Sequence, residues 1–277
     1  MKKKSSPARR RKKTSPQAAP KPAVALASTS FPVVGIGASA GGLEALELFL
    51  SHVPKHSGLA FVIVQHLDPT RKGIMPELLQ RATGMRVLQV KERTLIQPNC
   101  VYVIPPNKDM SILHGALHLL EPASPRGLRL PIDFFLRSLA ADQQEHSIGV
   151  ILSGMGSDGT LGLRAIKERG GLVLVQEPAT AKFDGMPRSA IDAGLADIVA
   201  PVQELPGRIL TYRQRTPLPP AAALTLTDKT QSALEKVIIL LRTHTGHDFS
   251  LYKRVFRKFL QGVQMEWATP IQAGVLC

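Results

Sequence analysis

The side chains best suited to carry out chemistry in this sequence are a serine, a histidine and an aspartate at positions 39, 66 and 158. A serine hydroxyl is a weak nucleophile until a neighbouring base removes its proton. A neutral imidazole can be that base, and a carboxylate can fix the imidazole tautomer and stabilise the imidazolium ion. If Ser39, His66 and Asp158 meet in the fold, the sequence therefore predicts acyl transfer with Ser39 as the nucleophile.

Ser39 lies in a segment of small residues that supports three interpretations. The pattern Gly37-x-Ser39-x-Gly41 matches a nucleophile elbow, a tight strand-to-helix turn that presents a serine above a sheet. The pattern Gly35-x-Gly37-x-x-Ala40 matches a loose dinucleotide-binding fingerprint, whose backbone amides would hold a pyrophosphate. The third interpretation is a turn of small residues in which Ser39 only caps a helix.

His66 follows the next predicted strand and bears on this choice. A dinucleotide site calls for an acidic residue at the end of that strand, where it would bind the ribose hydroxyls. The strand instead ends at Gln65-His66, although Asp68 lies close by and keeps the dinucleotide alternative open. A histidine at this strand end could accept a proton from Ser39, because the carboxyl ends of neighbouring parallel strands face a shared crevice. A surface loop histidine is the other interpretation.

Asp158 lies in Gly154-Met155-Gly156-Ser157-Asp158-Gly159, directly after an apolar run. An aspartate before glycine is also common in turns and at helix starts, which is the structural alternative. The three residues share a predicted sheet edge, so we expect them to converge there. Their order along the chain differs from the Ser, Asp, His order of α/β-hydrolases, so the elbow alone does not assign that fold.

The elements that must position these residues begin at Pro32, where β-branched runs start to alternate with amphipathic stretches. This pattern predicts a doubly wound α/β domain. Residues 100–104 and 110–120 look like antiparallel strands with a turn near His114 and Gly115, so we expect a mixed, mostly parallel sheet with a hairpin. The other predicted strands are 33–38, 59–65, 86–90, 148–152 and 172–175. The predicted helices are 43–51, 73–82, 132–144, 160–169, 189–193 and 205–213.

Charge is concentrated at the start of the chain, where residues 1–30 hold nine of the 35 Lys and Arg residues and no Asp or Glu. We expect this basic tail to be disordered; contact with nucleic acid or anionic lipid is open. Two cysteines, Cys100 and Cys277, are too few for a disulfide framework, and their spacing does not suggest zinc. The low cysteine content fits a reducing, cytoplasmic setting, and we expect no metal. Because no apolar run is long enough to span a bilayer, we expect a soluble protein.

Together these motifs resemble the catalytic domain of the chemotaxis protein-glutamate methylesterases over residues 31–212. The resemblance rests on three motifs: Gly37-Ala38-Ser39-Ala40-Gly41-Gly42, Val64-Gln65-His66 and Ser153 to Gly159. A fourth segment, Phe183-Asp184-Gly185-Met186-Pro187-Arg188, also resembles the family. It implies that Ser39 is the nucleophile, His66 the general base and acid, and Asp158 the orienting carboxylate. The amide of Met155, with that of Ala40 as a second donor, would bind the oxyanion.

The implied reaction is hydrolysis of glutamate γ-methyl esters on a methylated chemoreceptor or similar sensor, without a cofactor. Deamidation of glutamine would use the same acyl intermediate. Two rival hypotheses are a nucleotide-binding oxidoreductase and a non-catalytic docking remnant of a fusion protein.

The predicted organisation is a basic tail (1–30), a monomeric catalytic domain (31–213), a Pro- and Ala-rich linker (214–228) and a helical segment (229–277). That last segment resembles the opening helices of a fused methyltransferase. Because it ends without a Gly-rich cofactor loop, we expect a truncated segment without an adenosylmethionine site. The family's usual receiver domain is replaced here by the basic tail, so we expect a different mode of control.

Overall fold

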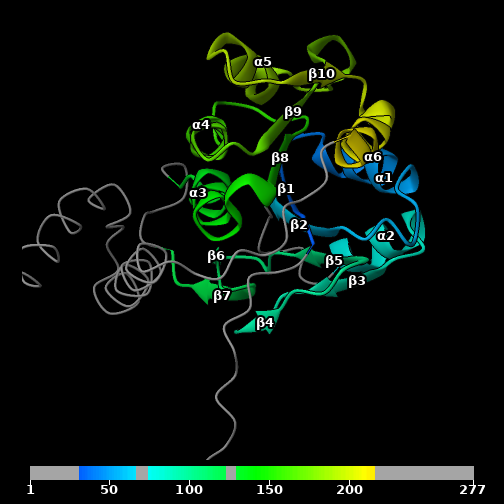
Figure 1. Ribbon diagram of the computed structural model, residues 1–277, viewed down its shortest axis with the longest axis vertical. Coiled ribbons are helices and arrows are strands. Elements are labelled where there is room, and N and C mark those ends of the chain that lie inside the picture. The colour runs from blue at the N-terminus through cyan, green and yellow to red at the C-terminus, as the bar shows by residue number, and fades with distance from the viewer. Residues whose placement is uncertain (1–30, 67–73, 123–128, 216–277) are drawn as a thin grey trace, which may run out of the picture.

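A seven-stranded parallel sheet forms the centre of the computed structural model, which describes residues 31–66, 74–122 and 129–215 (Figure 1). Its strand order is β10-β9-β8-β1-β2-β5-β3, and every neighbouring pair is parallel. The strands are β1 (Val33–Ala38), β2 (Ala60–Gln65), β3 (Arg86–Gln89), β5 (Cys100–Val103), β8 (Ser147–Ile151), β9 (Leu172–Gln176) and β10 (Ile198–Ala200).

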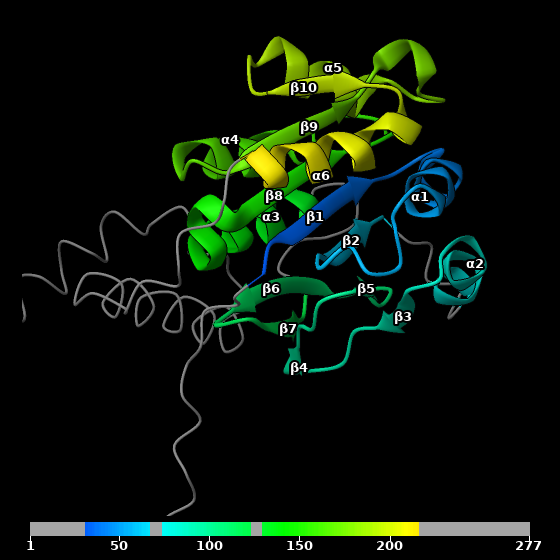
Figure 2. The same ribbon diagram turned by 45° about the vertical axis from the view of Figure 1, so that its right-hand side comes forward.

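Helices cover both faces of this sheet, as Figures 1 and 2 show. One apolar core lies between the sheet and α1 (Gly42–Ser51), α2 (Ile74–Ala82) and α6 (Leu205–Arg215). The other lies beneath α3 (Pro131–Gln143), α4 (Thr160–Glu168) and α5 (Gly185–Asp192). Short 3-10 helices are η1 (Gln144–His146), η2 (Pro178–Thr180) and η3 (Val202–Glu204). The predicted doubly wound α/β class is confirmed.

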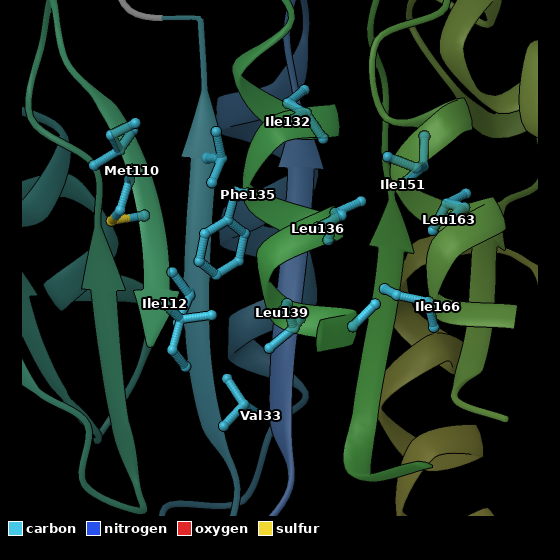
Figure 3. Packing of buried hydrophobic residues seen from close by; sticks show 14 of the residues in the cluster. Val33, Met110, Ile112, Ile132, Phe135, Leu136, Leu139, Ile151, Leu163 and Ile166 are labelled. Carbon is cyan, nitrogen blue, oxygen red and sulfur yellow. The ribbon is translucent and has the colours of Figure 1, made fainter. Parts of the chain in front are cut away.

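The central strand β1 is buried along its whole length, which explains its unbroken run of apolar and small residues. On the α3 side it presents Gly35 and Gly37. A Cβ on Gly37 would lie 2.4 Å from Ile132 Cγ2, and one on Gly35 would lie 2.7 Å from Leu136 Cδ2. Figure 3 shows these helix residues over the strand. The two glycines therefore serve the close approach of α3 to β1.

Strand β5 corrects the sequence prediction, which made residues 100–104 antiparallel. It pairs in parallel with both β2 and β3, and all four of its residues are buried, as expected for an interior parallel strand. After β5 the chain crosses into a different sheet instead of folding back beside it. The main sheet is therefore not mixed.

The antiparallel pairing lies in a separate small sheet of β4 (Thr94–Leu95), β7 (Ala116–Leu120) and β6 (Asp109–Leu113). The hairpin turn falls at His114 and Gly115, as predicted. Their φ angles of 52° and 69° are both positive, which is typical of a two-residue turn that follows the twist of the flanking strands. The hairpin packs against α3 rather than extending the main sheet.

Several boundaries differ from the predicted ones. Helix α5 begins at Gly185 instead of residue 189, because Pro187 is accommodated in its first turn. Strands β4 and β10 were not predicted, and α6 continues to Arg215, into the expected linker. Residue 73, the tail (1–30), the rest of the linker and the helical segment (229–277) lie outside the described residues. Within the described ranges, no helix combines the length and apolarity needed to cross a membrane.

Candidate active site

The three predicted residues follow three adjacent strands of the sheet. Ser39 comes directly after β1, His66 directly after β2, and Asp158 lies in the loop between β8 and α4. Strand β1 lies between β2 and β8, so the chain order reverses at this point. In open parallel sheets the crevice at such a reversal, beyond the carboxyl ends of the strands, is the usual place for a ligand.

The side chains of Ser39, His66 and Asp158 form one hydrogen-bonded chain. The Ser39 Oγ lies 3.1 Å from His66 Nδ1, and His66 Nε2 lies 3.0 Å from Asp158 Oδ2. An ionised Asp158 accepts the N–H at Nε2, which leaves Nδ1 as the acceptor for the serine proton. The geometry therefore suits activation of the serine hydroxyl by His66.

Asp158 is held by the start of helix α3 as well as by His66. Its Oδ2 accepts from the backbone N–H of Ile132 at 3.1 Å, and its Oδ1 accepts from that of Asp133 at 2.9 Å. The side chain is only 4% exposed. Backbone amides and the helix dipole at a helix N-terminus favour a carboxylate, so this setting stabilises a buried negative charge. Sequence reasoning missed this contribution, although Pro131 was a signal for a helix start there.

The loop that carries Ser39 is fastened by Ser153, a second residue that sequence reasoning did not single out as functional. The Ser39 N–H donates to the Ser153 carbonyl at 3.0 Å. The buried Ser153 hydroxyl donates to the Ala40 carbonyl at 2.9 Å and accepts from the Phe183 N–H at 3.0 Å. Ser153 therefore ties the Ser39 loop to the segment that begins at Phe183.

The two predicted oxyanion donors belong to two different loops. Ala40 is the direct neighbour of Ser39, and Met155 belongs to the loop after β8. Within that loop, Gly154 lies next to Ser39, because a Cβ on this glycine would lie 3.0 Å from Ser39 Cβ. Among the described residues, no acceptor is bound by the backbone N–H of Ala40 or Met155. Binding of an oxyanion by these two amides remains a prediction.

The segment Phe183 to Arg188 borders this loop. The Gly154 N–H donates to the Phe183 carbonyl at 2.9 Å, and the Met186 N–H donates to the Gly154 carbonyl at the same distance. In the part of the chain that the structure describes, no group of three or more His, Cys, Asp or Glu side chains could hold a metal ion.

The dinucleotide alternative gains no support from this arrangement. Gly35 and Gly37 face the side chains of α3, which fill the space beside them. Asp68 lies outside the described residues, while His66 occupies the strand end and contacts Ser39. The segment therefore positions a serine next to a base.

Comparisons with known proteins agree with the geometry. Residues 34–209 match the CheB methylesterase family. A protein-glutamate methylesterase/protein-glutamine glutaminase of Moorella thermoacetica is 37% identical over 178 residues, which are 62% of this chain and 42% of that protein. One of Geobacter sulfurreducens is 34% identical over 199 residues, 70% of this chain and 55% of that protein. The chain thus spans about half the length of these relatives.

A solved structure extends the comparison to the fold. The crystal structure of the Thermotoga maritima CheB methylesterase catalytic domain matches with a TM-score of 0.62 and 29% sequence identity, covering 66% of this chain and 100% of that one. The family match covers most of the chain and includes Ser39, His66 and Asp158. This chain therefore belongs to the CheB methylesterase family.

Proposed function

We propose that this chain is a protein-glutamate methylesterase that hydrolyses glutamate γ-methyl esters on a methylated chemoreceptor or similar sensor protein. The hydrogen-bonded chain from Ser39 through His66 to Asp158 carries the proposal. The names of the relatives supply the substrate class. We place the catalytic unit in residues 31–213.

In the first half of the reaction, Ser39 Oγ attacks the ester carbonyl carbon while His66 Nδ1 takes the hydroxyl proton. The negative charge that develops on the carbonyl oxygen is bound by the amides of Ala40 and Met155. When the tetrahedral intermediate collapses, the bond to the methoxy group breaks and methanol leaves with the proton from His66. Asp158 stabilises the imidazolium throughout.

In the second half, water attacks the acyl group on Ser39 while His66 Nδ1 removes one of its protons. The bond to Ser39 Oγ then breaks, the proton returns to that oxygen, and the free glutamic acid departs and loses its remaining proton to solvent. A glutamine side chain would form the same acyl intermediate with release of ammonia. Deamidation therefore needs no additional catalytic group.

The exposure of the site supports a side chain on a protein surface as the substrate. The His66 side chain is 37% exposed, Met155 is 61% exposed and Phe183 is 38% exposed. A glutamate ester that projects from a helix could reach Ser39 without unfolding. All three side chains of the triad come from one chain, so a monomer suffices, and a sensor's cytoplasmic segment places the reaction in the cytoplasm.

The test is methanol release from a purified, methylated cytoplasmic fragment of a chemoreceptor. We expect release by the wild type and by Ser157→Ala, an exposed neighbour in the Asp158 loop, and none above background by Ser39→Ala. Covalent labelling by a fluorophosphonate should fall on Ser39. Equal release by wild type and Ser39→Ala would refute the hydrolytic mechanism, while absence of both release and labelling in the wild type would favour the docking remnant.

A further inference from the structure

A second buried carboxylate lies next to the triad but takes no part in the mechanism above. Asp133 belongs to the first turn of α3 and is only 2% exposed. Its Oδ1 accepts from the backbone N–H of Gly159 at 3.0 Å and from that of Gly162 at 2.7 Å. These amides belong to the start of α4, and Gly159 follows Asp158 directly in the chain. Asp133 is therefore bonded to the segment that carries the triad carboxylate.

The two carboxylates form a reciprocal pair. Asp158, before α4, accepts from amides at the start of α3, including that of Asp133 itself. Asp133, in α3, accepts from amides at the start of α4. The helices touch at this point, because a Cβ on Gly162 would lie 3.2 Å from Asp133 Cα. Asp158 cannot move away from α3 without breaking bonds made by both carboxylates.

We propose that Asp133 is a positioning residue for Asp158. By holding the start of α4 against the start of α3, it fixes the place from which Asp158 reaches His66 Nε2. The inference rests on the proposed function, since it concerns the activation of Ser39 through His66.

The hydrogen bonds of Asp133 do not require it to be charged. Burial raises the pKa of its carboxyl to about 6, with the nearby Asp158 charge acting in the same direction. The Gly162 and Gly159 amides and the Arg137 guanidinium on α3 act in the opposite direction. Because Oδ1 can accept from both amides in either protonation state, an asparagine oxygen can take its place.

Asp142 provides a matched control at the opposite end of α3. Its Oδ1 accepts from the His114 N–H, and its Oδ2 accepts from the Gly115 N–H at 3.1 Å. Asp142→Ala therefore removes a carboxylate that holds two backbone amides, as Asp133→Ala does. Those amides belong to the β6–β7 turn and not to the segment that carries Asp158.

The experiment measures the rate at which a fluorophosphonate labels Ser39 in the full chain, below the unfolding temperature of every variant. Asp133→Ala should lower the limiting rate by about tenfold to hundredfold, since misplacement of a group by about 1 Å can cost about a hundredfold. The concentration for half-maximal rate should barely change, because the probe does not contact Asp133. Asp133→Asn should recover most of the rate, and Asp142→Ala should label like the wild type.

Three results would overturn the inference: wild-type labelling in Asp133→Ala, equal slowing in Asp142→Ala, or an Asp133→Asn as slow as Asp133→Ala. Should Asp133→Ala fail to fold, Asp133→Glu replaces it, because its carboxylate is one methylene longer and pushes the start of α4 away. Wild-type labelling in that variant would equally overturn the inference. If Ser39 is not labelled in the wild-type protein, the proposed function is refuted, and the inference fails with it.

Discussion

Replacing Asp158 with asparagine tests the triad at its most constrained member. In the wild type, Oδ2 accepts from His66 Nε2 and the Ile132 N–H, while Oδ1 accepts from the Asp133 N–H. All these partners donate to Asp158, so a carboxylate satisfies them and an amide cannot. The introduced side chain must present its NH₂ group either to His66 and the Ile132 N–H or to the Asp133 N–H.

Each orientation of the amide has a defined cost. With its oxygen toward Asp133, the NH₂ group faces His66 and favours the tautomer with the proton on Nδ1. That tautomer cannot accept the Ser39 proton. The equivalent change in chymotrypsin-like proteases, described for this kind of triad, lowers kcat by about 10⁴. With its oxygen toward His66, the amide leaves the Asp133 N–H buried without an acceptor, at about 1–3 kcal/mol. The first orientation leaves the Ile132 N–H without an acceptor at a similar cost, so neither orientation restores the wild-type arrangement. The first gives the wrong His66 tautomer and the second removes the negative charge that stabilises the imidazolium, so we expect a loss of about 10² to 10⁴.

The loss is measured as the rate of methanol release and, independently, as the rate of Ser39 labelling by a fluorophosphonate. Ser157→Ala is the control, because Ser157 is the exposed neighbour of Asp158 in the same loop. The circular dichroism spectrum should stay that of the wild type. A folded Asp158→Asn that retains more than about a tenth of the wild-type rate in both assays would show that His66 does not depend on this carboxylate.

Three further predictions concern stability and packing. Burial raises the pKa of Asp133 from 3.8 to about 6, so the folded protein binds the Asp133 proton more tightly than the unfolded chain does. The contribution of this carboxyl to the free energy of unfolding is therefore fully present below pH 3.8 and is lost as the pH rises through about 6. The free energy of unfolding of Asp133→Asn should therefore rise relative to that of the wild type by up to about 3 kcal/mol between about pH 4 and 7. Urea denaturation across this pH range measures the difference, and a difference that does not change with pH would contradict the prediction. Gly37→Ala would place a methyl group 2.4 Å from Ile132 Cγ2, so it should lower the free energy of unfolding by about 1–3 kcal/mol and slow the labelling of Ser39. Gly84→Ala is the control and should have neither effect, because the nearest atom to its new methyl group would lie 3.6 Å away. Ser153→Ala leaves the Phe183 N–H without its acceptor and should lower the free energy of unfolding, measured with denaturant, by about 1–3 kcal/mol. An unchanged unfolding midpoint would show that Ser153 does not hold the Ser39 loop in place.

Much of the fold could be read from the sequence because strands buried on both faces leave continuous apolar runs. Ser39 and His66 each follow such a run directly, so their place at one sheet edge could be predicted without coordinates. Strand β5 shows the limit, since a short apolar run does not reveal the direction of its neighbours. The support of Asp158 shows another limit, because its partners at Ile132 and Asp133 are backbone amides. Every residue except proline has such an amide, so no residue type marks them.

The place of β1 between β2 and β8 has a consequence for folding. Val33 is in register with Ala60 on one side and with Ser147 on the other, so one neighbour is local in sequence and the other distant. Contacts of high sequence separation form late, because closing a long loop costs entropy before pairing repays it. A chain still emerging from the ribosome can bring Ser39 and His66 together early, but the carboxylate arrives only when β8 docks. Recovery of Ser39 reactivity during refolding would therefore report this long-range docking step rather than the first collapse of the chain.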